Sequence, residues 1–470
     1  MDVMRKTIIF CLAFCGLGFV GISANPSSIT ITQPGLSEGY VAPANKEGIA
    51  GPPYGGLTGD VWNKRYRKLK DLEIGLRHYN IQWAGLESSG LPSSSTPLVC
   101  PAGYFLVPGS PEEKAAHHYK RYRCLNVRTV NLFDNMLARD AGVGIQSMAI
   151  LWNTPPIYQD SACHGMTWKG AIEKGGCVPR DDAMDDYEDY VRFLGTRYNG
   201  GAHGKIYHFI VWNENASGGW FDYSPRVNTL FHPLNPAEIK IWIDKYAEMM
   251  IRTRDALIGN TSGVLVYASI DPLWEPPAHR TEAHIGSRVL LEGLWERLGA
   301  RYTWSVAVHP YGNPAVPPRP GFYSFYNLEM VARFQEEHLA RLGVARSDAL
   351  HHPQAILLAS EQGWPQSIGI DNQAKAVCEA YDKALQLPNL IGLTHNLFQS
   401  FEASETDPKA MGEGAVGVHF GLLPYRSQRD LSDMDSYPTG RAFESTRPSV
   451  WGRSNDHYCC QEWQLGCIPR

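Results

Sequence analysis

Two glutamates stand where buried, apolar strands are expected to end. Glu214 follows the run FIVWN at residues 209–213, and Glu361 follows AILLAS at residues 355–360. A single carboxylate at such a place is commonplace, since many are solvated or paired with arginine. Two facing carboxylates are what glycoside hydrolysis needs. One is protonated to assist the leaving oxygen, and the other is ionised to attack the sugar carbon or to activate water. Burial and mutual repulsion keep their pKa values apart.

Other expected strand ends also carry polar and aromatic side chains. The run GIQSMAILW ends at Trp152 and Asn153, and the run TWSVAV is followed by His309 and Tyr311. An early strand adds further candidates for the wall of a site, which are Asn80, Trp83 and either Arg77 or His78. Aromatic rings stack on sugar rings, although packing beneath a loop is an equally good reading of each one. The candidate stacking platforms are Trp152, Trp220 and Trp364.

From about residue 72 onward, short apolar runs alternate with amphipathic helical patterns. The expected strands lie within residues 74–86 and at 144–152, 206–212, 264–270, 302–308, 355–360 and 390–397. Helical spacing covers 126–141, 182–198, a segment opening at 235, 285–298, 326–342 and 371–387. Apolar strands that are each followed by a helix indicate a parallel sheet covered by helices. We therefore predict an α/β fold, a (β/α)8 TIM barrel with long βα loops, with an open doubly wound sheet as the second choice. The eighth strand is expected either at 126–132 or in the segment before residue 70.

The ends of the chain differ from this central pattern. Residues 1–24 have the basic start, apolar middle and small-residue end of a secretory signal peptide, with a retained membrane anchor as the alternative reading. Residues 25–70 are expected to be an extended lead-in, residues 71–425 the catalytic barrel, and residues 426–470 a loop-like extension tied by cysteines. The prediction is a secreted, extracellular protein.

Cysteine use agrees with export. Eight cysteines follow the signal segment, and an even number in an exported chain indicates disulfides. Proximity in sequence favours Cys100 with Cys124, and Cys163 with Cys177. Cys467 would pair with Cys459 or Cys460, and Cys378 would take the one left over. A zinc site is the alternative, but no paired C-x-x-C spacing supports it.

Composition excludes several classes of function. The chain has 470 residues, 43% of them hydrophobic, and a formal net charge of −5, which gives no reason to expect a nucleic-acid partner. Beyond the first 24 residues no run of about 18 apolar residues suggests a membrane span in the mature chain. Residues 412–417 fit G-x-G-x-x-G but lack the strand and helix of a dinucleotide site. The motifs H-E-x-x-H and G-x-S-x-G are absent from the sequence. We expect no metal, no organic cofactor, a carbohydrate substrate and a monomer.

The strand-end motifs together resemble clan A of the glycoside hydrolases. The stretches VWNEN, HPYG and LLASEQGW match that clan's pattern, in which Asn-Glu ends strand four and Glu ends strand seven, over about residues 70–425. Within the clan the chain is most similar to a secreted, poorly characterised family that shares WNE followed by GGWFDYSP. The resemblance implies that Glu214 is the general acid/base and Glu361 the nucleophile. It implies further that Asn213 binds the sugar 2-hydroxyl, and that His309 and Tyr311 orient the nucleophile.

Two departures from the clan pattern concern the substrate. Asn215 stands where many members have proline, and Phe398 or Gln399 stands where strand eight often ends in tryptophan. Asn215 also opens the glycosylation sequon Asn-Ala-Ser, but a glycan there would obstruct the pocket, so we expect it to be unmodified. Asn260, which opens Asn-Thr-Ser after a helix, is the expected acceptor.

The sequence therefore predicts a secreted retaining glycoside hydrolase that uses two glutamates in a double displacement. A barrel that binds carbohydrate without cleaving it is the main alternative. A metal-dependent deacetylase on the same fold is a third reading, which the lack of a His/Asp ligand cluster disfavours.

Overall fold

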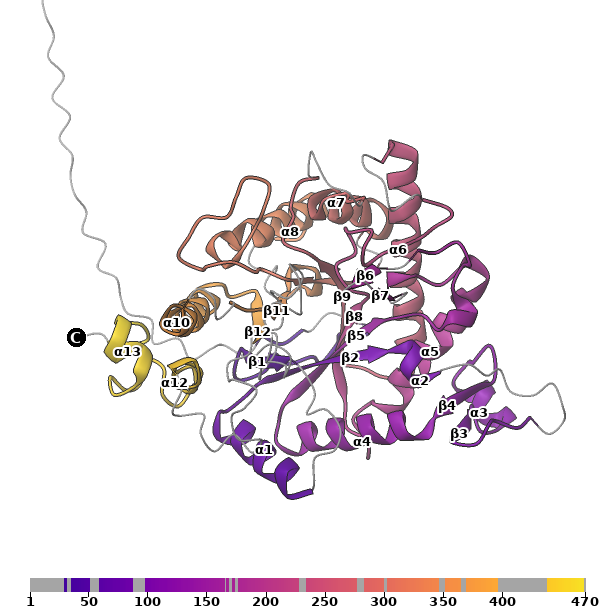
Figure 1. Ribbon diagram of the computed structural model, residues 1–470, viewed down its shortest axis with the longest axis horizontal. Coiled ribbons are helices and arrows are strands. Elements are labelled where there is room, and N and C mark those ends of the chain that lie inside the picture. The colour runs from indigo at the N-terminus through magenta and orange to yellow at the C-terminus, as the bar shows by residue number, and fades with distance from the viewer. Residues whose placement is uncertain are drawn as a thin grey trace, which may run out of the picture.

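The structure is a computed structural model (Figure 1). It describes residues 29–31, 35–50, 59–87, 98–164, 166–168, 171–173, 176–227, 234–276, 283–299, 302–345, 351–364, 369–395 and 438–468. The expected signal segment lies outside these ranges.

Eight parallel strands close into a barrel, in the order β1-β12-β11-β10-β9-β8-β5-β2. This confirms the predicted (β/α)8 barrel. The strands are β1 Glu47–Ala50, β2 Leu76–Gln82, β5 Gln146–Trp152, β8 Ile206–Val211, β9 Leu265–Ile270, β10 Ser305–Val308, β11 Leu357–Gln362 and β12 Leu390–His395. Two hairpins lie outside the barrel, β3 Tyr104–Val107 with β4 Arg123–Asn126 and β6 Met166–Trp168 with β7 Ala171–Glu173.

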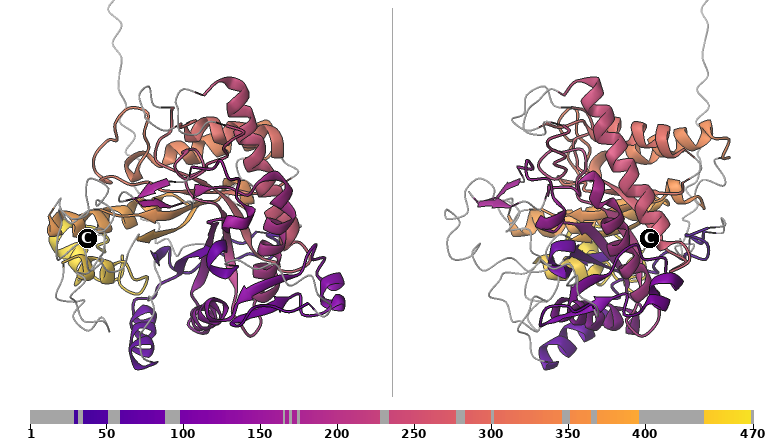
Figure 2. Two further views of the ribbon diagram at one scale, coloured as in Figure 1. Left: turned by 45° about the vertical axis from the view of Figure 1, so that its right-hand side comes forward. Right: turned by 90° about the vertical axis from the view of Figure 1, so that its right-hand side faces the viewer.

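Helices surround the barrel (Figures 1 and 2). The longer ones are α1 Gly59–Asp71, α4 Val127–Gly142, α5 Met184–Arg197, α6 Pro236–Leu257, α7 Ser287–Leu298, α8 Glu329–Arg341 and α10 Ile370–Gln386. Short helices are α2 Trp83–Leu86 and α3 Pro111–Ala116, with 3-10 turns at Pro156–Tyr158, Asp181–Ala183, Phe325–Asn327 and Pro353–Ala355. Helix α6 begins with a capping box, in which the Asn235 side chain accepts from Glu238 N–H and the Glu238 carboxylate accepts from Asn235 N–H.

The first barrel strand comes from the expected lead-in. Strand β1 is only four residues long and has no extended apolar run, so its sequence signal is weak. Gly48 is required there, because a Cβ would lie 2.6 Å from the Thr394 side chain and 2.8 Å from that of Leu76. The barrel thus begins at residue 47 and not at 71, which corrects the expected boundary. Residues 126–132, the other candidate for this strand, open helix α4 instead, capped by the Asn126 side chain.

Two apolar layers support the barrel. The interior layer includes Leu76, Met148, Ile210 and Leu358, all buried. A larger shell lies between the strands and the surrounding helices, with Trp242 and Tyr246 of α6 among its fully buried members. The interior is a packed core, so the polar groups at the carboxyl ends of the strands stand on a rigid base.

The C-terminal extension is helical where the structure describes it. Helices α12 Pro438–Ser445 and α13 Tyr458–Trp463 lie beside α10 in all three views (Figures 1 and 2). This corrects the loop-like expectation, which arose because both helices have fewer than ten residues. The disulfide Cys378–Cys459 joins α10 to α13, so the extension is tied to the barrel as expected.

The other disulfides are Cys100–Cys124, Cys163–Cys177 and Cys460–Cys467. The first two are the pairs that proximity in sequence favours. Among the described residues, no helix combines the length and the apolar character needed to cross a membrane.

We expect the double variant Cys378→Ala/Cys459→Ala to lose about 4 kcal/mol of unfolding free energy. The reason is that this disulfide closes a loop of 81 residues, and longer loops restrict the unfolded chain more. The matched control, Cys460→Ala/Cys467→Ala, opens a loop of only 7 residues and should lose about 2 kcal/mol. Urea unfolding followed by circular dichroism measures both losses. Equal losses in the two variants would contradict this explanation.

Candidate active site

The two glutamates lie at the carboxyl ends of parallel strands, on the same rim of the barrel. Glu361 is the second-last residue of β11, while Glu214 lies three residues after the end of β8. Strand β10, which carries His309 just past its end, pairs directly with β11, and β9 separates it from β8. Because all barrel strands run in one direction, these side chains meet at one rim.

His309 lies between the two carboxylates. Its Nδ1 is 2.9 Å from Glu214 Oε1 and 3.8 Å from Glu361 Oε2. The two oxygens are therefore no farther apart than the sum of these distances, about 6.7 Å. Tyr311 donates its hydroxyl proton to Glu361 Oε2 at 3.1 Å. The imidazole is fully buried, whereas 19% of the Glu214 side chain and 15% of the Glu361 side chain are exposed, so both carboxylates can reach a ligand.

The hydrogen on His309 can be assigned from its neighbours. Both groups close to Nδ1 are carboxylate oxygens, which accept hydrogen bonds, so Nδ1 carries the hydrogen and donates it to Glu214 Oε1. A proton on Glu214 therefore belongs on the other oxygen, Oε2. This arrangement leaves one defined oxygen of Glu214 free to donate a proton to a ligand.

Burial and charge set the protonation of this cluster. Burial raises the pKa of the Glu214 carboxyl, partly offset by His309, and the negative charges of Asp271 and Glu361 raise it further. For His309, burial alone would lower the pKa, but the charges of Glu361, Glu214 and Asp271 outweigh burial and raise it. Glu214 thus keeps its proton to a higher pH than an ordinary glutamic acid.

The backbone around Glu214 is in an unusual conformation. Trp212 has φ 64° and Glu214 has φ 43°, and on the neighbouring strand Asn153 has φ 62°. Side chains other than glycine avoid this left-handed region, at a cost of about 1 kcal/mol or more for each residue. The Glu214 N–H donates to Ser269 Oγ at 3.2 Å. Such strained residues cluster at functional sites, which fits their position on this rim.

Asn215 stabilises the same turn from behind. It is fully buried, and its Nδ2 donates to the carbonyl oxygens of Val211 and Ser269 at 3.1 and 3.0 Å. Its own carbonyl accepts from Trp242 Nε1. In the folded protein this amide is buried, and the absence of a glycan from this sequon stays a prediction. Asn260 is partly exposed and contacts His117 through Oδ1 at 2.9 Å, and its glycosylation stays a prediction.

Asn213 and His78 present unpaired polar atoms near the carboxylates. Asn213 is 6% exposed, and its Oδ1 has no hydrogen-bond partner in the described part of the chain. Neither ring nitrogen of His78 has a partner there. Burial lowers the pKa of His78 to about 4, although the charge of Glu361 opposes the shift. Buried polar atoms normally find partners, so both side chains are suited to contact a polar ligand or water.

Two of the four tryptophans among the candidate site residues are buried in the core. Trp83 is fully buried between the rings of Tyr158 and Tyr190, whose centroids lie 5.0 and 5.3 Å away. Trp364 is 2% exposed and donates Nε1–H to the Gly312 carbonyl. Trp83 therefore does not line the site as expected, and Trp364 has no exposed face to stack on a sugar. In both cases the packing alternative applies.

Trp152 and Trp220 are partly exposed and contact each other edge to face at 5.5 Å. They come from β5 and from the loop after Glu214, so they form an aromatic corner beside the site. Asn153, next to Trp152, donates its Nδ2–H to Gln82 Oε1 at 3.1 Å. Phe398, Gln399 and residues 412–417 lie outside the described residues.

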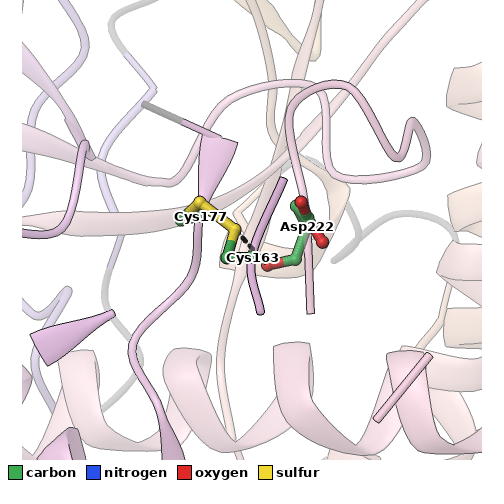
Figure 3. Close-up of side chains that lie close together, drawn as sticks. All are labelled: Cys163, Cys177 and Asp222. Carbon is green, nitrogen blue, oxygen red and sulfur yellow. Dashed lines mark hydrogen bonds between the residues drawn. A yellow bond between two sulfur atoms is a disulfide. The ribbon is translucent and has the colours of Figure 1, made fainter. Parts of the chain in front are cut away.

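A disulfide fixes the loops around this corner (Figure 3). Cys163 and Cys177 are joined, and the Asp222 carboxylate accepts from the backbone N–H groups of His164 and Ser224 at 2.8 and 3.0 Å. The side chains of Cys163, Cys177 and Asp222 also lie close enough together to hold a metal ion. Among the described residues, no other group of three or more histidine, cysteine, aspartate or glutamate side chains does so. Both sulfurs are already bonded to each other, so neither is available as a thiolate ligand.

Sequence reasoning missed two polar residues behind Glu214. Asp271 follows β9 directly, and its Oδ2 is 2.6 Å from Nε2 of His284. Asp271 is 5% and His284 1% exposed. Asp271 was detectable, because it occupies the same place after its strand as the other candidate residues. His284 follows no strand in sequence and had no such signal.

Comparison with known proteins adds the following findings. A family of unknown function (DUF5722) matches residues 108–336, a range that includes Glu214, His309 and Tyr311 but not Glu361. A search of curated proteins found no match.

Among solved structures, a family 39 glycoside hydrolase from the gut symbiont Bacteroides cellulosilyticus WH2 superposes with a TM-score of 0.50. The match covers 86% of this chain at 12% identity. The chain spans 63% of that hydrolase, less than two thirds of its length. A β-glucosidase mutant derived from a hyperthermophilic tetramer also gives a TM-score of 0.50, at 10% identity, over 90% of this chain and 98% of its own. The fold is that of the (β/α)8 glycoside hydrolases. At these identities the similarity concerns the fold alone.

We expect Trp83→Ala to lower the free energy of unfolding by about 3–5 kcal/mol, because it removes a large ring from a fully packed position. Trp220→Ala, at the partly exposed corner, should cost only about 1 kcal/mol. Urea denaturation monitored by circular dichroism compares the two. If Trp83→Ala were as stable as Trp220→Ala, Trp83 would not be the core residue described above.

Proposed function

We propose that this protein is a secreted retaining glycoside hydrolase that cleaves O-glycosidic bonds in an oligo- or polysaccharide. The observation that carries the proposal is the pair Glu214 and Glu361 on either side of His309, with carboxylate oxygens no more than about 6.7 Å apart. Retaining enzymes place their carboxyl groups about 5–5.5 Å apart, and inverting enzymes about 6.5–9.5 Å. The upper limit here includes the retaining spacing and only the shortest inverting spacings, which supports retention.

In this proposal Glu361 is the nucleophile. It attacks the anomeric carbon while the glycosidic oxygen leaves, and a glycosyl–enzyme ester forms. Tyr311, which donates to Glu361 Oε2, fixes the orientation of the carboxylate and leaves Oε1 to attack. His309 lies 3.8 Å from the same Oε2 and keeps a positive field beside it whenever the imidazole is protonated.

Glu214 serves as the acid and then as the base. Its raised pKa favours the protonated form, and its free oxygen donates the proton to the leaving group. Once the sugar is bound to Glu361, the ionised Glu214 removes a proton from the attacking water. Asn213, whose Oδ1 lacks a described partner, accepts a hydrogen bond from a sugar hydroxyl. Trp152 and Trp220 provide an apolar surface for the neighbouring sugar.

Secretion is part of the proposal, because the N-terminal segment has a signal-peptide pattern and four disulfides form in the described chain. The protein is proposed to act as a monomer without a metal or organic cofactor. A barrel that binds carbohydrate without cleaving it would retain the cleft but would not need the acid and the nucleophile placed around one imidazole.

We expect Glu361→Gln to abolish turnover and to abolish covalent labelling by a 2-fluoro glycoside, because the amide cannot attack the anomeric carbon. A panel of aryl glycosides and polysaccharides first identifies a substrate for the wild type, and intact-mass spectrometry detects the label. Glu296→Gln, an exposed glutamate on α7, is the control and should react like the wild type. Labelling that persists in Glu361→Gln would refute the nucleophile assignment, and binding without hydrolysis across the panel would favour the non-catalytic alternative.

We expect Glu214→Ala to depend strongly on the leaving group. Turnover of substrates with poor leaving groups should fall about 10²–10⁴-fold, while a dinitrophenyl glycoside should still form the glycosyl–enzyme, because its leaving group needs no proton. The wild-type rate on poor leaving groups should decline as pH rises through the raised pKa of Glu214, since the deprotonated acid cannot donate. Steady-state kinetics against pH measure both effects. Equal losses for good and poor leaving groups would contradict the acid role.

A further inference from the structure

The segment that carries Glu214 is attached to a second segment that precedes helix α7. Residues 216–218 lie antiparallel to residues 283–285, with Ser217 opposite His284. The Gly218 N–H donates to the Ala283 carbonyl at 2.8 Å, and the Ile285 N–H donates to the Ala216 carbonyl at 3.0 Å. Residues 283–285 therefore hold the loop that follows Glu214.

Asp271 determines where that second segment lies. His284 Nδ1 accepts the Gly286 N–H at 2.9 Å, so the ring hydrogen is on Nε2 and is donated to Asp271 Oδ2 at 2.6 Å. The other oxygen, Oδ1, accepts the Leu273 N–H at 2.9 Å. Ser287 donates to the Asp271 carbonyl, also at 2.9 Å. All of these groups are buried or nearly so.

Asp271 directly follows β9, the strand whose Ser269 holds the backbone of Glu214. Ser269, two residues before Asp271, accepts the Glu214 N–H through Oγ and the Asn215 N–H through its carbonyl at 3.3 Å. Asp271 also acts electrostatically on Glu214, on His309 and on Tyr323. The charged groups that face Glu214 are thus Asp271 from β9, His309 from β10 and Glu361 from β11.

We propose that Asp271 and His284 are a positioning pair for Glu214. The pair fastens residues 283–285, and with them the loop after Glu214, and it places a fixed negative charge behind the acid that favours the acid's protonated form. Neither residue touches the reacting atoms. The role in catalysis rests on the proposed function, but the structural and electrostatic parts do not require any substrate.

The charge of Asp271 helps to meet a requirement of the two-carboxylate reaction. Glu214 and Glu361 both lie close to the His309 imidazole, yet the proposed reaction requires Glu214 to be protonated and Glu361 to be ionised. Asp271 directly follows β9, which pairs with β8 and is separated from β11 by β10, and its negative charge raises the pKa of Glu214. It therefore biases the pair toward protonation of Glu214.

The test is a titration that needs no turnover. Protein labelled with ¹³C at the glutamate δ-carbon is titrated by NMR, and the Glu214 signal is assigned by its absence in Glu214→Gln. In Asp271→Asn, which keeps the shape but loses the charge, the Glu214 midpoint should fall by roughly half a pH unit or more. Asp244→Asn, at an ion pair on the outer face of α6, is the matched control and should leave the midpoint unchanged. An unchanged midpoint in folded Asp271→Asn would overturn the charge effect.

His284→Gln tests the positioning effect and retains the carboxylate. We expect the Glu214 midpoint to stay close to the wild-type value, while the amides of Gly218 and Ile285 exchange with deuterium at least 10-fold faster. Unchanged exchange at both amides would overturn the positioning role, whether or not Asp271→Asn folds. Because neither measurement uses a substrate, failure of this proposal is distinct from failure of the hydrolase proposal, which the Glu361→Gln experiment decides.

Discussion

One buried imidazole between two carboxylates is the interaction on which this site depends. His309 cannot turn away, since its ring is fully buried and its backbone N–H donates to the Ile270 carbonyl at 3.2 Å. Its single Nδ1–H lies near an oxygen of each glutamate, so it limits their separation and selects the oxygen of Glu214 that is left free. Without this ring, the two glutamates would lose the group that lies close to an oxygen of each.

The barrel provides the rigidity that this arrangement requires. Each important side chain stands at or just past the carboxyl end of a strand whose lower part is packed into the interior layer. The left-handed residues Trp212 and Glu214 are costly, and their conformation persists because buried groups surround them. Asn215 accounts for much of this support, with two hydrogen bonds from one amide. A proline at this position, as in many clan A members, could not form those bonds.

The sequence predicted the fold well because its strongest signals are periodic and local. Strand β8, helix α6 and their neighbours have long apolar patterns and clear helix starts, and the alternation of strands and helices implies a barrel. Strand β1 was misplaced because four residues around Gly48 have no such pattern, and their strand conformation comes from pairing with β2 and β12. The helices of the extension were missed because they are short and depend on a disulfide and on packing against α10.

For the site, position after a strand was the useful signal. It identified Glu214, Glu361, His309 and Tyr311, which the structure brings together, and it would also have identified Asp271. Aromatic type was a poor signal, because Trp83 and Trp364 lie in the core while Trp152 and Trp220 are partly exposed. The presence of a tryptophan in the sequence does not show whether its ring will be buried in the core or exposed to a ligand. His284 could not have been found, since its role arises from the pairing of residues 283–285 with residues 216–218.

The most direct test of the account is the stereochemistry of the first product. Proton NMR follows the anomeric signals during the first minutes of hydrolysis of a substrate of known configuration, before the released sugar mutarotates. Attack by Glu361 followed by attack of water activated by Glu214 predicts that the first sugar released has the same anomeric configuration as the substrate. A first product of the opposite configuration would contradict the double displacement and the assignment of Glu361 as a nucleophile.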